Sequence, residues 1–342
     1  MPEDIDAAKA QKLSIGQPVP EFPLVFTWHE HYWPCIFDKQ IDLIRQDIRR
    51  ARADGKLIVY LSCPISARGG GDQSTNIDIA RAVERRLLSQ WGERFWVLNP
   101  AQYQLESKEG TGMMEEHAKS CNLDLTKLRA ASQPSGGDYM RMWTKVLVED
   151  QGLYNFGDPR SAQPALKNTG QHFDAFYFIG PHDVYEFFLQ ESSFNLTTAI
   201  EGHFASKFAT NPDFRDSYSL PGLVWRSGWQ DDTALTAAEK INQATLRVQW
   251  REKRRQYLRF YALRASVNFS LGSHDEWEIF RQINAKRRGM LMAPNGDNVG
   301  IAEQLAGFFD QKQIDPGAAE AEISRGYASA GPASPVKGTS TT

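Results

Sequence analysis

The chain has 342 residues, of which 41% are hydrophobic and 24% charged, so it can form one large globular domain or two ordinary ones. Its 39 basic and 42 acidic residues nearly balance, which excludes a global electrostatic argument for binding nucleic acid or a membrane surface. Three widely spaced cysteines argue against a disulfide framework or a zinc site, and the lack of a signal peptide or long apolar run predicts a soluble, cytoplasmic protein.

Residues 1–36 predict a loose leader followed by an aromatic arm, because 21–36 is dense in aromatic rings and carries prolines. A helix is predicted over 41–53, where apolar residues recur every three or four positions. Residues 57–61 form a short, apolar, β-branched run, which is typical of a buried parallel strand.

A glycine-rich loop at 67–72, a helix over 76–90 and a second strand at 95–98 follow. This order of strand, loop, helix and strand indicates a βαβ unit with a right-handed crossover, and therefore a parallel sheet. Residues 101–137 form a long insertion with two short helices at 112–120 and 123–131, and connections of this length often serve as lids.

The second half of the chain continues the alternation of helices and strands. The further predicted elements are a helix over 139–149, a third strand at 173–179, a helix over 197–209 and a fourth strand at 223–225. Residues 231–315 then become mainly helical, and 316–342 have the small-residue composition of a disordered tail. The predicted fold class is α/β, a Rossmann-like (flavodoxin-like) parallel sheet flanked by helices within 37–230, with a mainly helical C-terminal extension.

The loop after the first strand is one candidate site. Gly69, Gly70 and Gly71 permit a close approach of the backbone to a ligand, and their amides lead into a helix N-terminus, which favours an anion. The alternative interpretation is a flexible surface loop, because the pattern matches neither GxGxxG nor the P-loop.

Two carboxylates are the next candidates. Glu201 lies in the first turns of the helix that follows the third strand, at the sheet edge where open α/β folds bind ligands. The alternative for Glu201 is a carboxylate that interacts only with the helix dipole. Asp138 follows two glycines, and it either caps the next helix or takes part in the chemistry.

Two other segments are weaker candidates. His29 and His31 share one strand face, but no matching third ligand is evident, so we expect an aromatic packing arm and no metal. The segment Ser273-His274-Asp275-Glu276 has the pattern of a helix N-cap with acids in the first turn, and we do not interpret it as a catalytic triad.

Five short motifs together resemble the nucleoside 2-deoxyribosyltransferase-like superfamily, which includes 2′-deoxynucleoside 5′-phosphate N-hydrolases. The motifs are Tyr60-Leu61-Ser62-Cys63-Pro64, Arg68-Gly69-Gly70-Gly71, Val97-Leu98-Asn99-Pro100, Phe173-Asp174-Ala175-Phe176 and Thr197-Thr198-Ala199-Ile200-Glu201-Gly202. The last motif resembles the Gly-Ser/Thr-x-x-Glu-hydrophobic-Gly helix start that carries the catalytic glutamate of the family. The resemblance covers roughly residues 57 to 226.

The resemblance implies cleavage of an N-glycosidic bond in a nucleoside or nucleoside 5′-monophosphate, by hydrolysis or by transfer to a second base. Glu201 would stabilise or capture the oxocarbenium-like anomeric carbon, and the Tyr60 hydroxyl would orient it. Asp138 or a water would protonate the departing base. The implied substrate-binding residues are Ser62, Pro64, Arg68, Gly69, Gly70, Gly71, Asn195 and Thr198, with Arg68 and the glycines holding a 5′-phosphate. No cofactor is expected, and by resemblance the protein would form a homo-oligomer.

Departures from the family pattern keep two other hypotheses open. Asn195 stands where transferases carry an aspartate, and Thr197 stands where the family has glycine, so the protein is alternatively a nucleotide-binding sensor without turnover. A third hypothesis is an interaction module for nucleic acid or protein, built on the basic helix around Arg247–Arg259 with its interleaved aromatic residues. A solvated helix face is the favoured interpretation of that helix, so nucleic acid is not an expected partner.

Overall fold

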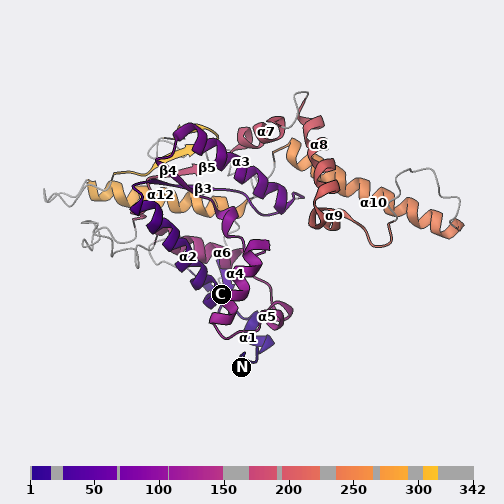
Figure 1. Cartoon of the computed structure of the whole chain (residues 1–342), viewed down its shortest axis with the longest axis horizontal. Coiled ribbons are helices and arrows are strands. Elements are labelled where there is room, and N and C mark those ends of the chain that lie inside the picture. Colours follow the sequence, from indigo (N-terminus) through magenta and orange to yellow (C-terminus); the bar gives the residue numbers. More distant parts are fainter. Residues whose placement is uncertain are drawn as a thin grey trace, which may run out of the picture.

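A five-stranded, mostly parallel sheet flanked by helices forms the centre of this α/β protein (Figure 1). In spatial order its strands are β4 (Phe95–Leu98), β3 (Leu57–Ser62), β5 (Ala175–Phe178), β6 (Ala306–Phe309) and β7 (Lys312–Ile314). Every neighbouring pair is parallel except β6 and β7, which are antiparallel. This computed structural model describes residues 2–16, 26–67, 70–106, 108–148, 169–190, 195–223, 236–264, 270–291 and 303–314.

Helices cover both faces of the sheet (Figure 1). One layer contains α2 (Trp33–Ala53), α6 (Gly136–Val148) and α12 (Leu271–Leu291), and the opposite layer contains α3 (Gln73–Trp91) and α7 (Pro181–Gln190). Strand β5 shows why two layers form, since its side chains alternate between the faces. Phe176 lies against Phe280 of α12, whereas Tyr177 lies against Trp91 of α3.

The structure confirms the βαβ unit that the sequence predicts. Strands β3 and β4 pair in parallel, with α3 as the crossover between them, and a short 3-10 helix (Pro100–Tyr103) follows β4. The insertion after it contains two helices, as predicted, α4 (Lys108–Ser120) and α5 (Leu125–Ala131).

The C-terminal part of the chain differs from the prediction. Residues 224 and 225 of the predicted fourth strand lie outside the described residues, and Leu223 is not in a strand. The fourth and fifth strands are β6 and β7, so the region predicted as a helical extension completes the central sheet. Strand β6 has only four residues and contains Gly307, whose lack of a side chain admits the Phe280 ring, because a Cβ there would lie 2.6 Å from Phe280 Cζ. The predicted tail, 316–342, lies outside the described residues.

In the described residues between β5 and α12, the chain forms the helices α7 to α10. The last three are α8 (Leu196–Thr210), α9 (Pro212–Tyr218) and α10 (Ala237–Ala262), and Figure 1 shows them extending away from the sheet. An aromatic cluster joins them, in which the Phe204 ring lies 5.3 Å from Phe214 and 5.1 Å from Tyr257. These helices therefore form a packed insertion, not a continuation of the sheet.

The N-terminal segment is more regular than predicted. It contains α1 (Ala7–Gln11) and an antiparallel strand pair, β1 (Leu13–Gly16) and β2 (Phe26–His29), where the sequence predicts a loose leader and an irregular arm. Strand β2 packs against α6, which brings the N-terminal segment to the same side of the sheet as α2 and α6.

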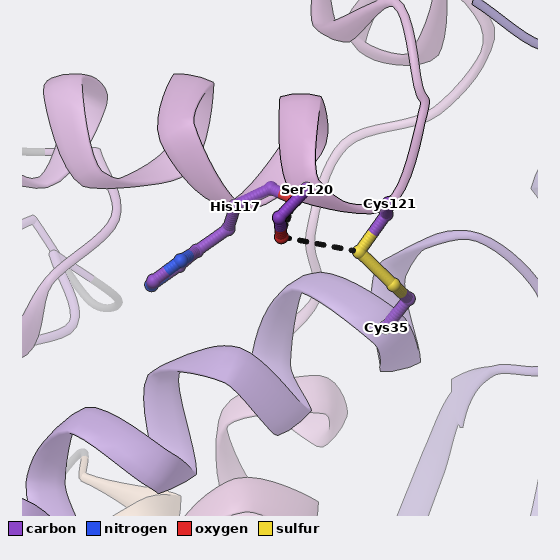
Figure 2. The surroundings of a disulfide bond; sticks show 4 residues. All are labelled: Cys35, His117, Ser120 and Cys121. Carbon is purple, nitrogen blue, oxygen red and sulfur yellow. Dashed lines mark hydrogen bonds between the residues drawn. A yellow bond between two sulfur atoms is a disulfide. The ribbon is translucent and has the colours of Figure 1, made fainter.

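A disulfide joins Cys35, near the start of α2, to Cys121, just after α4 (Figure 2). The expectation of no disulfide is therefore wrong, because 86 positions separate these cysteines and no local spacing reveals that they meet. Disulfides are typical of oxidising compartments, so the cytoplasmic assignment stays a prediction.

Among the helices of the described ranges, none has both the length and the apolar character needed to cross a membrane.

Candidate active site

A cavity of about 490 Å³ lies where β3 and β4 end, beside the first turns of α12. Its volume is in the range of pockets that bind small molecules. Phe26, Tyr139 and Trp143 supply aromatic rings to its wall. The other lining residues are Thr27, Cys63, Ile65, Ser66, Gln73, Pro100, Gln104, Glu106, Ser135, Gly136, Gly137, Met140, Ser270, Leu271, Gly272, Ser273, Asp275 and Glu276.

Glu276 is the most buried carboxylate that lines this cavity, with 5% of its surface exposed. The Tyr60 hydroxyl donates a hydrogen bond to Glu276 Oε1 at 2.6 Å, and the Ser62 hydroxyl donates one to Oε2 at 2.6 Å. Tyr60 and Ser62 are two positions apart on β3, so both side chains leave the same face of the sheet. One strand thus holds both oxygens of the carboxylate.

Burial controls the ionisation of this group. Burial raises the pKa of Glu276 to about 7, although the hydrogen bonds from Ser62 and Tyr60 act in the opposite direction by stabilising the charged form. Burial and the neighbouring Glu276 raise the pKa of Tyr60 well above its ordinary value, so the phenol stays protonated and remains a donor.

Aromatic packing fixes the position of Tyr60. Its ring lies 5.7 Å from Trp143 of α6, 6.1 Å from Phe173 and 5.3 Å from Phe176, its neighbour across the β3–β5 pair. Such contacts restrict the ring to one orientation. The carboxylate of Glu276 is therefore held by a donor that is itself immobilised.

Asp275 precedes Glu276 on α12 and lines the same cavity. Burial, with a smaller contribution from Glu278, raises the pKa of Asp275 to about 7. The helix begins at Leu271, and the Ser270 hydroxyl accepts a hydrogen bond from the Ser273 amide at 3.2 Å, as an N-cap does. A helix with a serine cap does form here, but the predicted cap at Ser273 is wrong, because the helix begins three residues earlier and both acids lie in its second turn.

Glu201 is not among the residues that line the cavity. It lies on α8, its side chain is 45% exposed, and it accepts a hydrogen bond from Arg254 of α10 at 3.3 Å. The predicted meeting of Tyr60 and Glu201 is therefore wrong, because α8 belongs to the inserted helices and α12 is the helix that packs along the sheet.

Asp138 forms part of a helix cap, the alternative that the sequence left open. Its Oδ2 accepts hydrogen bonds from the Ser135 amide and hydroxyl, each at 2.7 Å, and its amide donates to Ser135 Oγ. The His29 amide and Nδ1 also contact this carboxylate, each at 2.7 Å. Asp138 is buried and does not line the cavity, so the structure does not place it as a proton donor.

Within the described ranges, no three His, Cys, Asp or Glu residues form a cluster suited to a metal ion.

The described part of the glycine loop packs against α10. A Cβ on Gly71 would lie 2.5 Å from Phe260 Cε1, and Gly70 has a φ of 105°. Asp72 caps α3 by accepting a hydrogen bond from the Thr75 amide at 2.7 Å, so the helix N-terminus predicted to bind an anion already contacts a carboxylate of its own. Arg68 and Gly69 lie outside the described residues.

The other predicted substrate-binding residues lie in different parts of the structure. Asn195 caps α8 by accepting a hydrogen bond from the Thr198 amide at 2.9 Å, and both residues are exposed on the inserted helices. Pro64 is buried and is not among the lining residues. Ser62 lies at the cavity through its bond to Glu276, so the structure brings Tyr60 and Ser62 together and leaves Asn195 and Thr198 elsewhere.

The basic helix forms as predicted, but its tyrosines do not face solvent. Tyr257 and Tyr261 of α10 are buried, and the Tyr261 hydroxyl accepts a hydrogen bond from the Asp72 amide at 3.0 Å. Neither ring is available to stack on a base. The arrangement agrees with the favoured interpretation of a solvated basic face above a packed aromatic face.

Sequence reasoning missed Glu276, although a signal for it exists. The segment Gly272-Ser273-His274-Asp275-Glu276-Trp277 fits the Gly-Ser/Thr-x-x-Glu-hydrophobic-Gly pattern more closely than Thr197–Gly202 does, because it contains the first glycine and the hydrophobic residue, although Glu278 stands at the final glycine. Comparison with known proteins gives no further guide, since no family model, curated protein or solved structure matches the chain.

Proposed function

We propose that the protein cleaves the N-glycosidic bond of a nucleoside or nucleoside 5′-monophosphate, as a hydrolase or as a deoxyribosyltransferase, with Glu276 as the carboxylate at the anomeric carbon. The observation that carries the proposal is a buried carboxylate in a cavity, with each oxygen held by a hydroxyl from β3. Glu276 takes the role that the sequence assigned to Glu201.

The geometry suits an oxocarbenium-like transition state. The carboxylate of Glu276 would stabilise the developing cation at C1′, or capture it as a glycosyl ester. Tyr60 and Ser62 would keep the carboxylate in place through both steps. A water molecule as acceptor gives hydrolysis, and a second base as acceptor gives transfer.

The topology of the sheet supports a Rossmann-like assignment. Numbered along the chain within the sheet, the strand order is 2-1-3-4-5, which is the flavodoxin-like order. In such folds the ligand lies outside the carboxyl ends of the strands where successive connections diverge, here between β3 and β5. Tyr60 and Ser62 belong to β3, one of the two strands at that point, although the cavity itself opens on the other side of β3, where β4 ends.

The lining of the cavity favours an uncharged nucleoside. Tyr139 and Trp143 offer ring faces for a base, and Gln104 offers an amide for its polar edge. Glu106, Asp275 and Glu276 contribute three carboxyl groups, and none of the described lining residues is a lysine or arginine. Arg68, the residue predicted to hold a phosphate, lies outside the described residues. If Arg68 binds the 5′-phosphate, an Arg68→Ala variant should lose activity on the 5′-monophosphate and keep it on the nucleoside.

Two glutamine variants test the proposal. The wild-type protein, Glu276→Gln and Glu201→Gln are assayed by chromatography for free base released from ribo- and deoxyribonucleosides and their 5′-monophosphates. We expect Glu276→Gln to lose about a thousandfold or more of kcat/KM, in the range of other catalytic groups. Glu201→Gln is the matched control and should stay within about twofold, because an exposed ion pair contributes little.

Two results would contradict the proposal. Undiminished base release by Glu276→Gln removes this carboxylate from the reaction. Saturable calorimetric binding of a nucleoside by the wild-type protein, without release of base from any substrate, would support the nucleotide-binding sensor instead.

A further inference from the structure

We propose that Asp275 is the general acid of this site and protonates the departing base while Glu276 faces the anomeric carbon. The inference rests on the proposed function and assigns a second catalytic residue to it. Asp275 and Glu276 are consecutive on α12, and both line the cavity.

The partners of the two acids distinguish their roles. Each oxygen of Glu276 accepts a hydrogen bond from a hydroxyl, which stabilises its charged form. Within the described residues, the carboxyl group of Asp275 makes no hydrogen bond or ion pair, so it is free to bind a ligand. Asp138 cannot supply the proton in its place, because the Ser135 cap and His29 occupy its carboxylate away from the cavity.

The surroundings of Asp275 keep one proton on the pair. The titratable groups around it are His274, Glu276 and Glu278 on its own helix, Cys63 after β3, Glu106 after β4 and Tyr139 on α6. Burial lowers the pKa of His274, which favours its neutral form. Burial raises the pKa of both acids to about 7, and the described lining contains no lysine or arginine that would stabilise two negative charges, so protonated carboxyl groups persist near neutral pH. The hydroxyls on Glu276 direct the proton of the pair to Asp275.

The reaction then balances in two steps. In the first, the bond between C1′ and the base nitrogen breaks, its electron pair goes into the base, and a ring nitrogen of the base, N7 in a guanine nucleoside, takes the proton from Asp275, so that the base leaves neutral. The Glu276 carboxylate stabilises C1′ or forms an ester bond with it. In the second, water attacks C1′, the bond to Glu276 breaks if one formed, and the water proton returns to Asp275.

An Asp275→Asn variant tests the assignment with two leaving groups. The substrates are guanosine or 2′-deoxyguanosine, whichever the wild type cleaves, and the corresponding 7-methyl nucleoside, whose base leaves without needing a proton. We expect Asp275→Asn to lose about a hundredfold or more of kcat on the unmethylated substrate, as general acids contribute. On the 7-methyl substrate it should stay within about threefold, which also shows that the variant is folded.

The pH profile supplies a second readout. For the wild type, kcat/KM on the unmethylated substrate should rise as Glu276 ionises and fall as Asp275 loses its proton, and Asp275→Asn should lack the falling limb. Glu278→Gln is the matched control, because Glu278 is three positions from Asp275 on the same helix and pairs with Arg281 outside the cavity. It should keep the falling limb, moved towards lower pH because Glu278 contributes to the raised pKa of Asp275, and its maximum kcat should stay within about threefold of wild type on both substrates.

The outcomes separate this inference from the proposed function. Equal losses by Asp275→Asn on the two substrates, or no loss on either, would overturn the role of Asp275 while leaving Glu276 in place. Glu276→Gln should lose activity on both substrates. A wild-type protein that releases base from none of the ribo- and deoxyribonucleosides and their 5′-monophosphates would contradict the proposed function, and the inference with it.

Discussion

Burial makes the charged form of Glu276 energetically unfavourable in the folded protein. Its pKa of about 7 in the folded state lies above the ordinary value of 4.5, so the folded protein binds this proton more tightly than the unfolded chain does. The stability that the group contributes is therefore fully present below pH 4.5 and is lost as the pH rises through 7. The cavity keeps a carboxylate at the expense of stability, as functional sites often do.

Replacing Glu276 should consequently stabilise the protein at alkaline pH while abolishing activity. We expect Glu276→Gln to raise the free energy of unfolding by about 1–3 kcal/mol at pH 8, because glutamine has no buried charge to desolvate. The difference should shrink towards pH 5, where the wild-type carboxyl group is protonated in the folded state. Thermal or urea unfolding at the two pH values measures it. A stability gain that is the same at both pH values, or a loss at pH 8, would contradict this account.

At the scale of the elements, α6 shapes the cavity by crossing β2 at unusually short distance. A Cβ on Gly137 would lie 1.5 Å from the carbonyl oxygen of Thr27, so no larger residue fits there without moving the backbone. A Cβ on Gly136, the preceding residue, would meet nothing within 4 Å. Both glycines line the cavity, and together they make a matched pair.

We expect Gly137→Ala to lower the free energy of unfolding by about 3 kcal/mol or more, since the clash is with backbone. Gly136→Ala should be neutral or stabilise by up to about 1 kcal/mol, because alanine favours the helix. Urea unfolding of the two variants makes the comparison. Similar stabilities for both variants would show that α6 and β2 separate easily.

The sequence predicted the helices and strands better than it predicted which of them pack against one another. Periodicity located the βαβ unit and most helices, because local patterns depend on which face of an element is buried. It did not show that α8 belongs to an insertion, since helical spacing does not identify the neighbour on which a helix packs. The sequence therefore predicted Glu201 as the carboxylate of the site, whereas the structure has Glu276 there. Tyr60 and Ser62 were predicted for the site and do contact its carboxylate, because their places follow from the strand that contains them.

At the scale of the whole molecule, the disulfide between Cys35 and Cys121 links α2 to the end of α4 and closes a loop spanning 86 positions (Figure 2). A cross-link over a loop of that length contributes about 2–4 kcal/mol by restricting the unfolded chain. The loop includes β3 and β4, and therefore the strand that holds Glu276.

We expect a reducing agent to lower the melting temperature of the wild-type protein and to leave that of a Cys35→Ser/Cys121→Ser double variant unchanged. The double variant should melt close to the reduced wild type. Calorimetry with and without reductant measures both. A melting temperature of wild type that does not respond to reductant would mean that this bond does not contribute to stability.

The bond between Tyr60 and Glu276 joins residues 216 positions apart. Contacts between such distant residues form late in folding, because closing a long stretch of chain carries an entropic penalty that nearby pairs avoid. On a ribosome, β3, α3 and β4 would emerge and pair long before α12 is made. The proposed active site would therefore be among the last parts of a newly made molecule to form, and an incomplete translation product ending before α12 would contain β3, β4 and β5 but lack Glu276, β6 and β7.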